Sequence, residues 1–185
     1  MFTQFLILCV LISLFVIAVY FVCSWLAWSF SSRLDIPFIP TPYSSLSLIQ
    51  RRLAVKKGDV VYDIGCGDGR VLFYCARRHP DARFIGLELN PFFVFWMQVR
   101  KFLTRTTNVE IRRENIFTAE MSDATKIYAF LLQDLTDKFF SAGRFPGVRV
   151  VSRAYQISRA TPVEIFRITP HDIWYGGHLA YVYEL

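Results

Sequence analysis

The hydrophobic pattern is most uneven at the beginning of the chain. Residues 1–32 contain no charged side chain, and from Phe5 to Ala27 nearly every position is Phe, Leu, Ile, Val, Ala or Cys. A run of about 23 such residues forms roughly 35 Å of helix, which crosses a hydrocarbon core of about 30 Å. Trp25 and Trp28 stand near the end of the run, where amphipathic rings favour a membrane interface. The pattern predicts a transmembrane anchor over residues 1–32; the alternative, a cleaved signal peptide, has a shorter apolar segment preceded by basic residues.

Beyond the anchor, short apolar runs alternate with amphipathic segments. The proline-rich stretch at 33–42 forbids a regular helix and predicts an extended linker. Strands separated by helices imply a parallel sheet covered on both faces, and two final strands joined by a turn at Gly176-Gly177 imply an antiparallel hairpin. We therefore expect an α/β domain over 43–185: a doubly wound, mostly parallel seven-stranded sheet with an antiparallel C-terminal hairpin. The predicted strands are 59–64, 82–89, 108–113, 126–132, 147–154, 163–169 and 178–184; the predicted helices are about 45–54, 69–79, 91–104 and 134–142.

Charge predicts the orientation of the anchor. The chain carries a net charge of +6, and its first basic residue comes after the apolar run. Under the positive-inside tendency, the N-terminus lies outside and the domain faces the cytoplasm. A mildly basic domain suits an anionic membrane surface, whereas the scattered basic residues argue against a nucleic-acid partner. The basic residues that follow the run first are Arg33, Arg51, Arg52, Lys56 and Lys57.

The four cysteines indicate neither a disulfide framework nor a zinc site. Cys9 and Cys23 fall in the apolar run, Cys66 lies between glycines, and Cys75 falls in a predicted helix. None has CxxC spacing, so we expect no bound metal. This usage fits a reducing cytoplasm.

Candidate chemistry begins with VYDIGCGDGRV at 61–71, where a strand, a glycine loop and a helix follow one another. Such an arrangement presents backbone N–H groups and the positive end of a helix to a ligand. A dinucleotide site requires G-x-G-x-x-G, but this loop has G-x-G-x-G at 65–69 and places Arg70 where the third glycine would stand. Asp63, two residues before the loop, suits a cationic ligand better than a pyrophosphate. S-adenosylmethionine, with its sulfonium, ammonium and carboxylate groups, fits these features; a purely structural turn is the alternative.

Two polar residues at later strand ends extend this site. Glu88 ends the second predicted strand, about 20 residues beyond the loop, where a carboxylate can accept hydrogen bonds from ribose hydroxyls. Asn115 follows the third strand and offers both a donor and an acceptor to an adenine edge. The alternatives are an ordinary strand-end glutamate for Glu88 and a turn-forming amide for Asn115.

The run DIGCGDG at 63–69, together with Glu88 and Asn115, resembles the successive cofactor motifs of class I (seven-strand) S-adenosylmethionine-dependent methyltransferases. With PFIPTPY in the linker and GLELNPF after the second strand, the chain also resembles the small membrane-anchored protein lysine methyltransferases that act on the ATP synthase c-ring or the adenine nucleotide carrier. Members of the class commonly have aspartate where this chain has Asn115. The resemblance implies S-adenosyl-L-methionine as cofactor and the cofactor-binding residues Asp63, Gly65, Cys66, Gly67, Gly69, Glu88, Leu89 and Asn115.

On the acceptor side, attention falls on LLQDL at 131–135, after the fourth predicted strand. Amino-methyltransferases that act on planar nitrogens carry Asn/Asp-Pro-Pro-Tyr there, and its absence argues against adenine or glutamine amide acceptors. Gln133 and Asp134 are the candidate catalytic residues. Asp134 can accept a hydrogen bond from a target ammonium, or can serve as a helix N-cap.

The leading interpretation is a single-pass, membrane-anchored S-adenosylmethionine-dependent methyltransferase that acts on protein lysine, with a membrane protein as a candidate substrate. Two alternatives stay open. One keeps the cofactor but changes the acceptor to a lipid, a small molecule or RNA. The other is a non-catalytic membrane adaptor that binds the cofactor.

Overall fold

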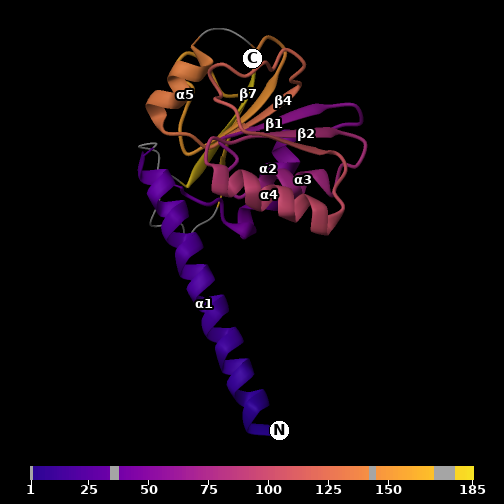
Figure 1. Ribbon diagram of the computed structural model, residues 1–185. Coiled ribbons are helices and arrows are strands. Elements are labelled where there is room, and N and C mark those ends of the chain that lie inside the picture. Colours follow the sequence, from indigo (N-terminus) through magenta and orange to yellow (C-terminus); the bar gives the residue numbers. More distant parts are fainter. Residues whose placement is uncertain (1, 34–37, 142–144, 169–177) are drawn as a thin grey trace. The chain divides into compact units, whose positions relative to one another are not determined.

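A computed structural model describes residues 2–33, 38–141, 145–168 and 178–185. The chain divides into two compact units, Met1–Phe38 and Ile39–Leu185 (Figure 1). The first unit contains one helix, α1 (Phe2–Arg33), in which Gln4–Cys23 is long and apolar enough to cross a bilayer. Residues 34–37 of the predicted linker lie outside the described residues, and the boundaries 1–32, 33–42 and 43–185 stay predictions.

The second unit is built on a seven-stranded sheet in the order β3-β2-β1-β4-β5-β7-β6. The first five strands are parallel, and β7 pairs antiparallel with both β5 and β6, which confirms the predicted fold class. The predicted turn at Gly176-Gly177 falls outside the described residues. The strands are β1 (Val60–Ile64), β2 (Arg83–Leu87), β3 (Val109–Arg112), β4 (Lys126–Ala129), β5 (Arg149–Arg153), β6 (Glu164–Arg167) and β7 (Leu179–Glu184).

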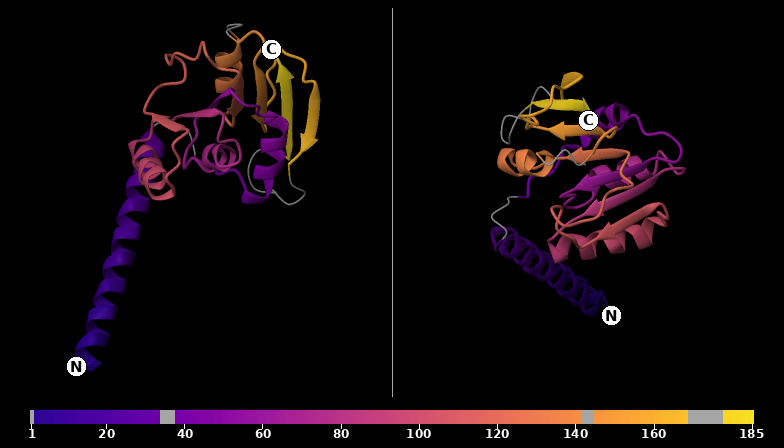
Figure 2. Two further views of the ribbon diagram at one scale, coloured as in Figure 1. Left: turned by 90° about the vertical axis from the view of Figure 1, so that its right-hand side faces the viewer. Right: turned by 90° about the horizontal axis from the view of Figure 1, so that it is seen from above.

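Helices cover both faces of the sheet (Figures 1 and 2). Side chains of α2 (Leu46–Leu53), α3 (Arg70–Ala76) and α4 (Pro91–Thr104) contribute to one hydrophobic core, and α5 (Gln133–Phe140) contributes to the other. Within β1, Val61 packs into the first core and the next residue, Tyr62, into the second, as the two-residue period of a strand requires. A short 3₁₀ turn, Tyr43–Ser45, precedes α2.

The elements are one to three residues shorter than predicted at several ends. The predicted strand 126–132, for example, ends as β4 at Ala129, because the chain leaves the sheet there to begin α5. By contrast, α4 has its predicted bounds, since Asn90 caps it by accepting from the N–H of Phe92 (3.0 Å) and Pro91 fits its first turn. What matters for function is the register of β1 on β2, which pairs Asp63 with Gly86 and Ile64 with Leu87. The carboxyl ends of these two strands therefore lie side by side.

Candidate active site

The glycine loop leaves the end of β1 through a backbone that only glycine adopts easily. Gly65, Gly67 and Gly69 have φ values of +70°, +54° and +72°. The N–H groups of Gly65 and Cys66 both donate to the carbonyl of Leu87 at the end of β2, at 2.9 and 3.0 Å. Several N–H groups that the sequence analysis assigned to a ligand are therefore bonded within the protein, and the loop offers mainly a surface free of side chains.

Asp63 is a buried carboxyl beside this loop, with a side chain whose Oδ2 has no hydrogen-bond partner among the described residues. Burial, reinforced by the carboxylates of Asp68 and Glu88, raises the pKa of Asp63 to about 8, although a hydrogen bond from the backbone N–H of Leu72 opposes the shift. Buried polar atoms are nearly always satisfied. An acceptor left open at a glycine loop therefore indicates a missing donor, and a cationic ligand would also favour the ionised carboxylate.

Glu88 lies just past β2 with both carboxylate oxygens fixed by backbone amides. Its Oε2 accepts from the N–H of Gly67 and its Oε1 from the N–H of Asn90, each at 2.8 Å. Each carboxylate oxygen has a second lone pair, so Glu88 retains acceptor capacity for a ligand hydroxyl. Asp63 and Glu88, from neighbouring strands, thus meet around the same loop.

An ionic tie that the sequence analysis missed joins the loop to the segment before α2. Arg70 donates to Asp68 through Nε (3.0 Å) and Nη2 (2.6 Å), and through Nη1 to the carbonyl of Thr41 (3.0 Å). The guanidinium lies over the ring of Tyr43, 4.8 Å from its centroid. The hydroxyl of Thr41 also bonds to that of buried Tyr128 on β4 at 2.9 Å. The sequence holds no local signal for these contacts, because Thr41 and Tyr128 are 87 residues apart.

Three of the predicted cofactor residues lie in less specific settings. The Cys66 side chain is buried and contacts Sδ of Met97 through its Sγ (3.6 Å), so only its backbone borders the loop. Leu89 is partly exposed next to Glu88. Asn115 is exposed, and its Oδ1 accepts from the N–H of Phe117 at 3.0 Å. Asn115 therefore stabilises a turn, the alternative considered above, and its adenine role stays a prediction.

The two predicted catalytic residues begin α5. Gln133 donates through Nε2 to Oδ2 of Asp137 (2.7 Å) and to the carbonyl of Gln156 (2.9 Å), so its amide braces the helix against a neighbouring loop. Leu132 occupies the N-cap position, and Asp134 is an exposed residue of the first turn rather than the cap. Their catalytic roles stay predictions.

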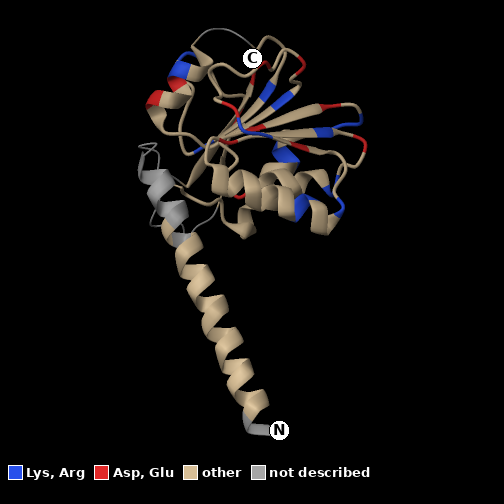
Figure 3. Cartoon of the chain, viewed as in Figure 1, with Lys and Arg blue, Asp and Glu red and all other residues tan. Residues whose placement is uncertain are grey.

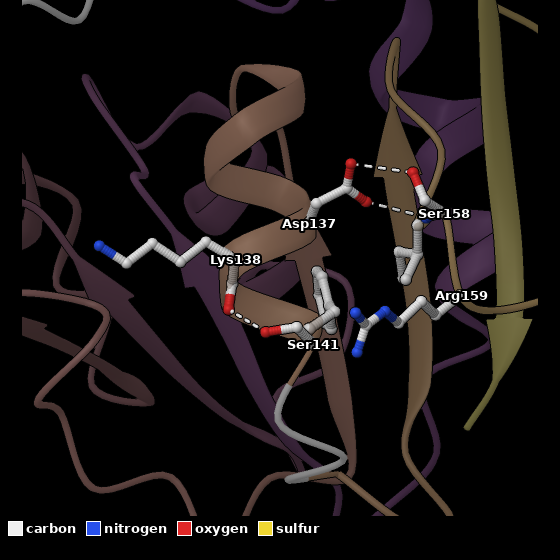
Figure 4. Close-up of a pocket in the computed structure, with 7 residues that line it drawn as sticks. Asp137, Lys138, Ser141, Ser158 and Arg159 are labelled. Atoms are coloured by element: carbon white, nitrogen blue, oxygen red, sulfur yellow. Dashed lines mark hydrogen bonds between the residues drawn. The ribbon is translucent and has the colours of Figure 1, made fainter.

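A hollow of about 360 Å³ lies elsewhere, between α5 and the segment that follows β5 (Figure 4). Ser158 donates to Asp137 across it through its N–H (2.9 Å) and its hydroxyl (2.8 Å). It contains none of the predicted site residues, so we assign the candidate active site to the glycine loop. Within the described part of the chain, no cluster of three or more His, Cys, Asp or Glu could hold a metal. The lining residues are Asp137, Lys138, Phe140, Ser141, Ile157, Ser158 and Arg159.

The sequence profile of the ANTKMT methyltransferase domain matches residues 63–164, over half of the 185 residues. The chain belongs to this methyltransferase family. The family match begins at Asp63 and includes the glycine loop and Glu88. The chain is thus an S-adenosylmethionine-dependent methyltransferase with the class I fold, as predicted.

Individual relatives agree with this assignment. A protein-lysine N-methyltransferase from Saccharolobus islandicus is 27% identical over 159 residues, which cover 81% of this chain and 94% of the relative. A lysine N-methyltransferase from Caenorhabditis elegans, named for a subunit of ATP synthase, is 31% identical over 120 residues, covering 57% of this chain and 60% of the relative. The crystal structure of an RNA methyltransferase from Salinibacter ruber in complex with S-adenosyl-L-homocysteine has a TM-score of 0.68 at 29% identity, covering 79% of this chain and 93% of that one.

Proposed function

We propose that this methyltransferase is anchored in a membrane by α1 and methylates lysine side chains of protein on the cytoplasmic side. The observation that carries the chemistry is the pair of carboxylates at the glycine loop: Asp63, buried with an open acceptor, and Glu88, fixed by two backbone amides. The protein-lysine acceptor is supported by the Saccharolobus islandicus relative, which the chain matches over nearly its whole length.

The residues of the site fit S-adenosylmethionine on two observations of this structure. Asp63 Oδ2 lacks a donor, and the loop backbone has no side chains that would fill the space beside it. Asp63 would stabilise the cationic end of the cofactor, Glu88 would accept from the ribose hydroxyls, and Leu89 and Asn115 would border the adenine. When bound, the cofactor supplies a methyl group on a sulfonium, which an amine attacks from the side opposite to the sulfur.

On the acceptor side, the protein has to hold a lysine amine in line and in its neutral form. Burial of the amine disfavours its charged form. Asp134 is exposed in the first turn of α5, at the end of β4, where its carboxylate could accept a proton or a hydrogen bond from the incoming ammonium. Gln133, braced by Asp137, would keep this turn in position.

The membrane location is supported by length, composition and charge. Gln4–Cys23 meets the requirement for a membrane span, although signal sequences share these properties. The basic residues that follow α1 place the catalytic domain on the cytoplasmic side by the positive-inside tendency. The Caenorhabditis elegans relative is named for a component of ATP synthase that is itself a membrane protein. A membrane-protein lysine is therefore the acceptor that best fits an anchored domain.

The deciding experiment is mass spectrometry of lysine methylation in membrane proteins from cells with and without this gene. We expect methyl-lysine at one or a few sites that disappears in the deletion and returns with the wild-type chain, but not with Glu88→Ala. A full membrane proteome without any gene-dependent methyl-lysine would contradict the protein-lysine assignment.

RNA is the second candidate acceptor, favoured by the Salinibacter ruber structure and by the net charge of +6. Purified full-length protein, incubated with methyl-labelled cofactor and fractionated cell extract, separates the candidates. Label in protein supports the proposal, and label confined to RNA or lipid replaces the acceptor. No turnover in any fraction, despite cofactor binding, would support a non-catalytic adaptor.

A further inference from the structure

Helix α4 has two apolar faces, and only one of them is buried. Phe93 and Met97 are buried in the domain. The other face, called here the outer face, is solvent-exposed to a degree unusual for large apolar side chains. It consists of Phe95 (66% exposed), Trp96 (51%), Phe102 (81%) and Leu103 (72%).

The outer face is contiguous rather than a scatter of single residues. The pairs Phe95-Trp96 and Phe102-Leu103 are seven residues apart, two helical turns, and therefore lie on the same side of α4. Helical spacing places Val99 between them. A soluble helix normally presents polar residues opposite its buried face, and a continuous apolar patch marks an interaction surface. No core of the described domain residues includes this patch.

Charge around the outer face identifies the kind of partner. Residues 91–109 contain no Asp or Glu, but they contain three basic residues, Arg100, Lys101 and Arg105. In Figure 3 the α4 ribbon is tan except for blue positions near its C-terminal end. None of the salt bridges among the described residues involves Lys101 or Arg105. Their charges are thus available to an anionic partner.

An apolar, aromatic face flanked by cations and free of acids is the composition of a helix that lies in the surface of an anionic bilayer. Trp96 suits the interface between headgroups and acyl chains in particular. A second copy of the chain is a poorer partner. A symmetric contact through α4 would bring the cations of both copies together without any acidic residue to neutralise them.

We propose that the outer face of α4 inserts into the surface of an anionic lipid bilayer, so that the catalytic domain rests on the membrane. This inference rests on the proposed function only for the presence of a membrane. Its consequence concerns the active site: α4 begins at Pro91, three residues after Glu88, so its first turn adjoins the cofactor end of the sheet. Docking α4 would keep that end close to the bilayer, within reach of lysines at the surface of a membrane protein.

The test uses the full-length chain in nanodiscs with Trp25, Trp28 and Trp174 changed to Phe, so that Trp96 is the only tryptophan. We expect a blue-shifted Trp96 emission and quenching by brominated lipids, both stronger with phosphatidylglycerol than with phosphatidylcholine alone, and both weakened by salt. Lys101→Ser and Arg105→Ser should each lower the ratio of quenched to unquenched Trp96 about fivefold in phosphatidylglycerol. Bound S-adenosylhomocysteine and circular dichroism verify that each variant is folded.

The matched control carries Val163→Trp with Trp96→Phe. Val163 is 62% exposed and lies next to β6, at the edge of the sheet opposite to β3 and α4 (Figure 2). Its tryptophan should stay water-exposed and unquenched. Trp96 quenching no greater than in this control overturns the inference, and so does a blue shift without lipid quenching, which would mean that protein covers the face. Because lipid contact is read without methyl transfer, lysine methylation without quenching removes this inference alone, and quenching without lysine methylation removes the proposed acceptor alone.

Discussion

Glu88 and Gly67 are joined by a hydrogen bond of 2.8 Å from the glycine N–H to Oε2 of the carboxylate. The N–H of Asn90 holds the other oxygen at the same distance. The end of β2 and the loop after β1 are therefore locked together before any ligand binds. This preorganisation lowers the cost of ordering the site around a nucleoside.

Glu88→Ala should weaken S-adenosylhomocysteine binding, because it removes a charged acceptor from the ribose side of the site. The loss of a hydrogen bond to a charged group costs roughly 1.5–3 kcal/mol, or about 10- to 100-fold in dissociation constant by calorimetry. Glu88→Gln, which keeps one carbonyl oxygen, should lie in between. Glu110→Ala is the control, since Glu110 pairs with Arg83 and Arg112 on the far side of β2. Unchanged affinity in Glu88→Ala would remove the ribose role.

Asp63→Asn should separate stability from cofactor binding. The pKa of Asp63 is raised from an ordinary 3.8 to about 8 by burial and by the neighbouring carboxylates. Between these values the folded protein holds a proton that the unfolded chain has released, so the contribution of Asp63 to stability is present below about pH 4 and is lost as the pH rises to about 8. The neutral amide has no such loss. Asp63→Asn should therefore raise the free energy of unfolding, relative to wild type, increasingly across this window, with a plateau above it.

The measurement is urea unfolding of ligand-free protein at about pH 4 and about pH 9, together with calorimetry. The same substitution should weaken binding of S-adenosylmethionine, since a neutral amide stabilises a cation less well than a carboxylate does. In the wild type, binding of the cationic cofactor near neutral pH should release a proton, which is detected with buffers of different ionisation enthalpy. A stability difference independent of pH would show that Asp63 is ionised in the free protein.

The sequence predicted the fold because hydrophobic periodicity and helix caps act locally. The Asn90-Pro91 start of α4 and the period-two burial of β1 are read directly from neighbouring residues. Strand ends were less predictable: β4 stops at Ala129, although Phe130 and Leu131 continue the apolar run. Where an apolar segment leaves the sheet depends on the tertiary path, which periodicity does not encode.

The candidate site was predicted in part, for a similar reason. Strand-end carboxylates and a loop of glycines leave a local signature, so Asp63 and Glu88 could be singled out. The hydrogen bond between Thr41 and Tyr128 and the brace from Gln133 to Gln156 join residues far apart in sequence. Such contacts depend on register and side-chain direction, and no spacing rule predicts them.

Gly69→Ala should reduce both stability and cofactor binding. Gly69 has a φ of +72°, and an added Cβ would lie 2.7 Å from Sδ of Met97. Gly58→Ala is the matched control, because Gly58 has a φ of +85° but open space around its Cβ position. Backbone strain alone costs about 1–2 kcal/mol in either variant. Urea unfolding should show a larger loss for Gly69→Ala, and calorimetry should show a loss of affinity in that variant only. Equal effects of the two substitutions would mean that Met97 moves away freely.

Arg70→Lys should loosen the tie between the glycine loop and Thr41. Lysine keeps the charge but lacks the planar fork that contacts Asp68 and the Thr41 carbonyl together, so at least one partly buried partner loses its donor, at about 1–3 kcal/mol. Arg83→Lys is the control, because its pairs with Glu110 and Asp123 are exposed, and such pairs contribute about 0–1 kcal/mol. We expect a lower free energy of unfolding and faster proteolysis near residues 41–43 in Arg70→Lys, with both protected by S-adenosylhomocysteine. Should the two lysine variants unfold and be cleaved alike, the tie to Thr41 does not hold this segment against the loop.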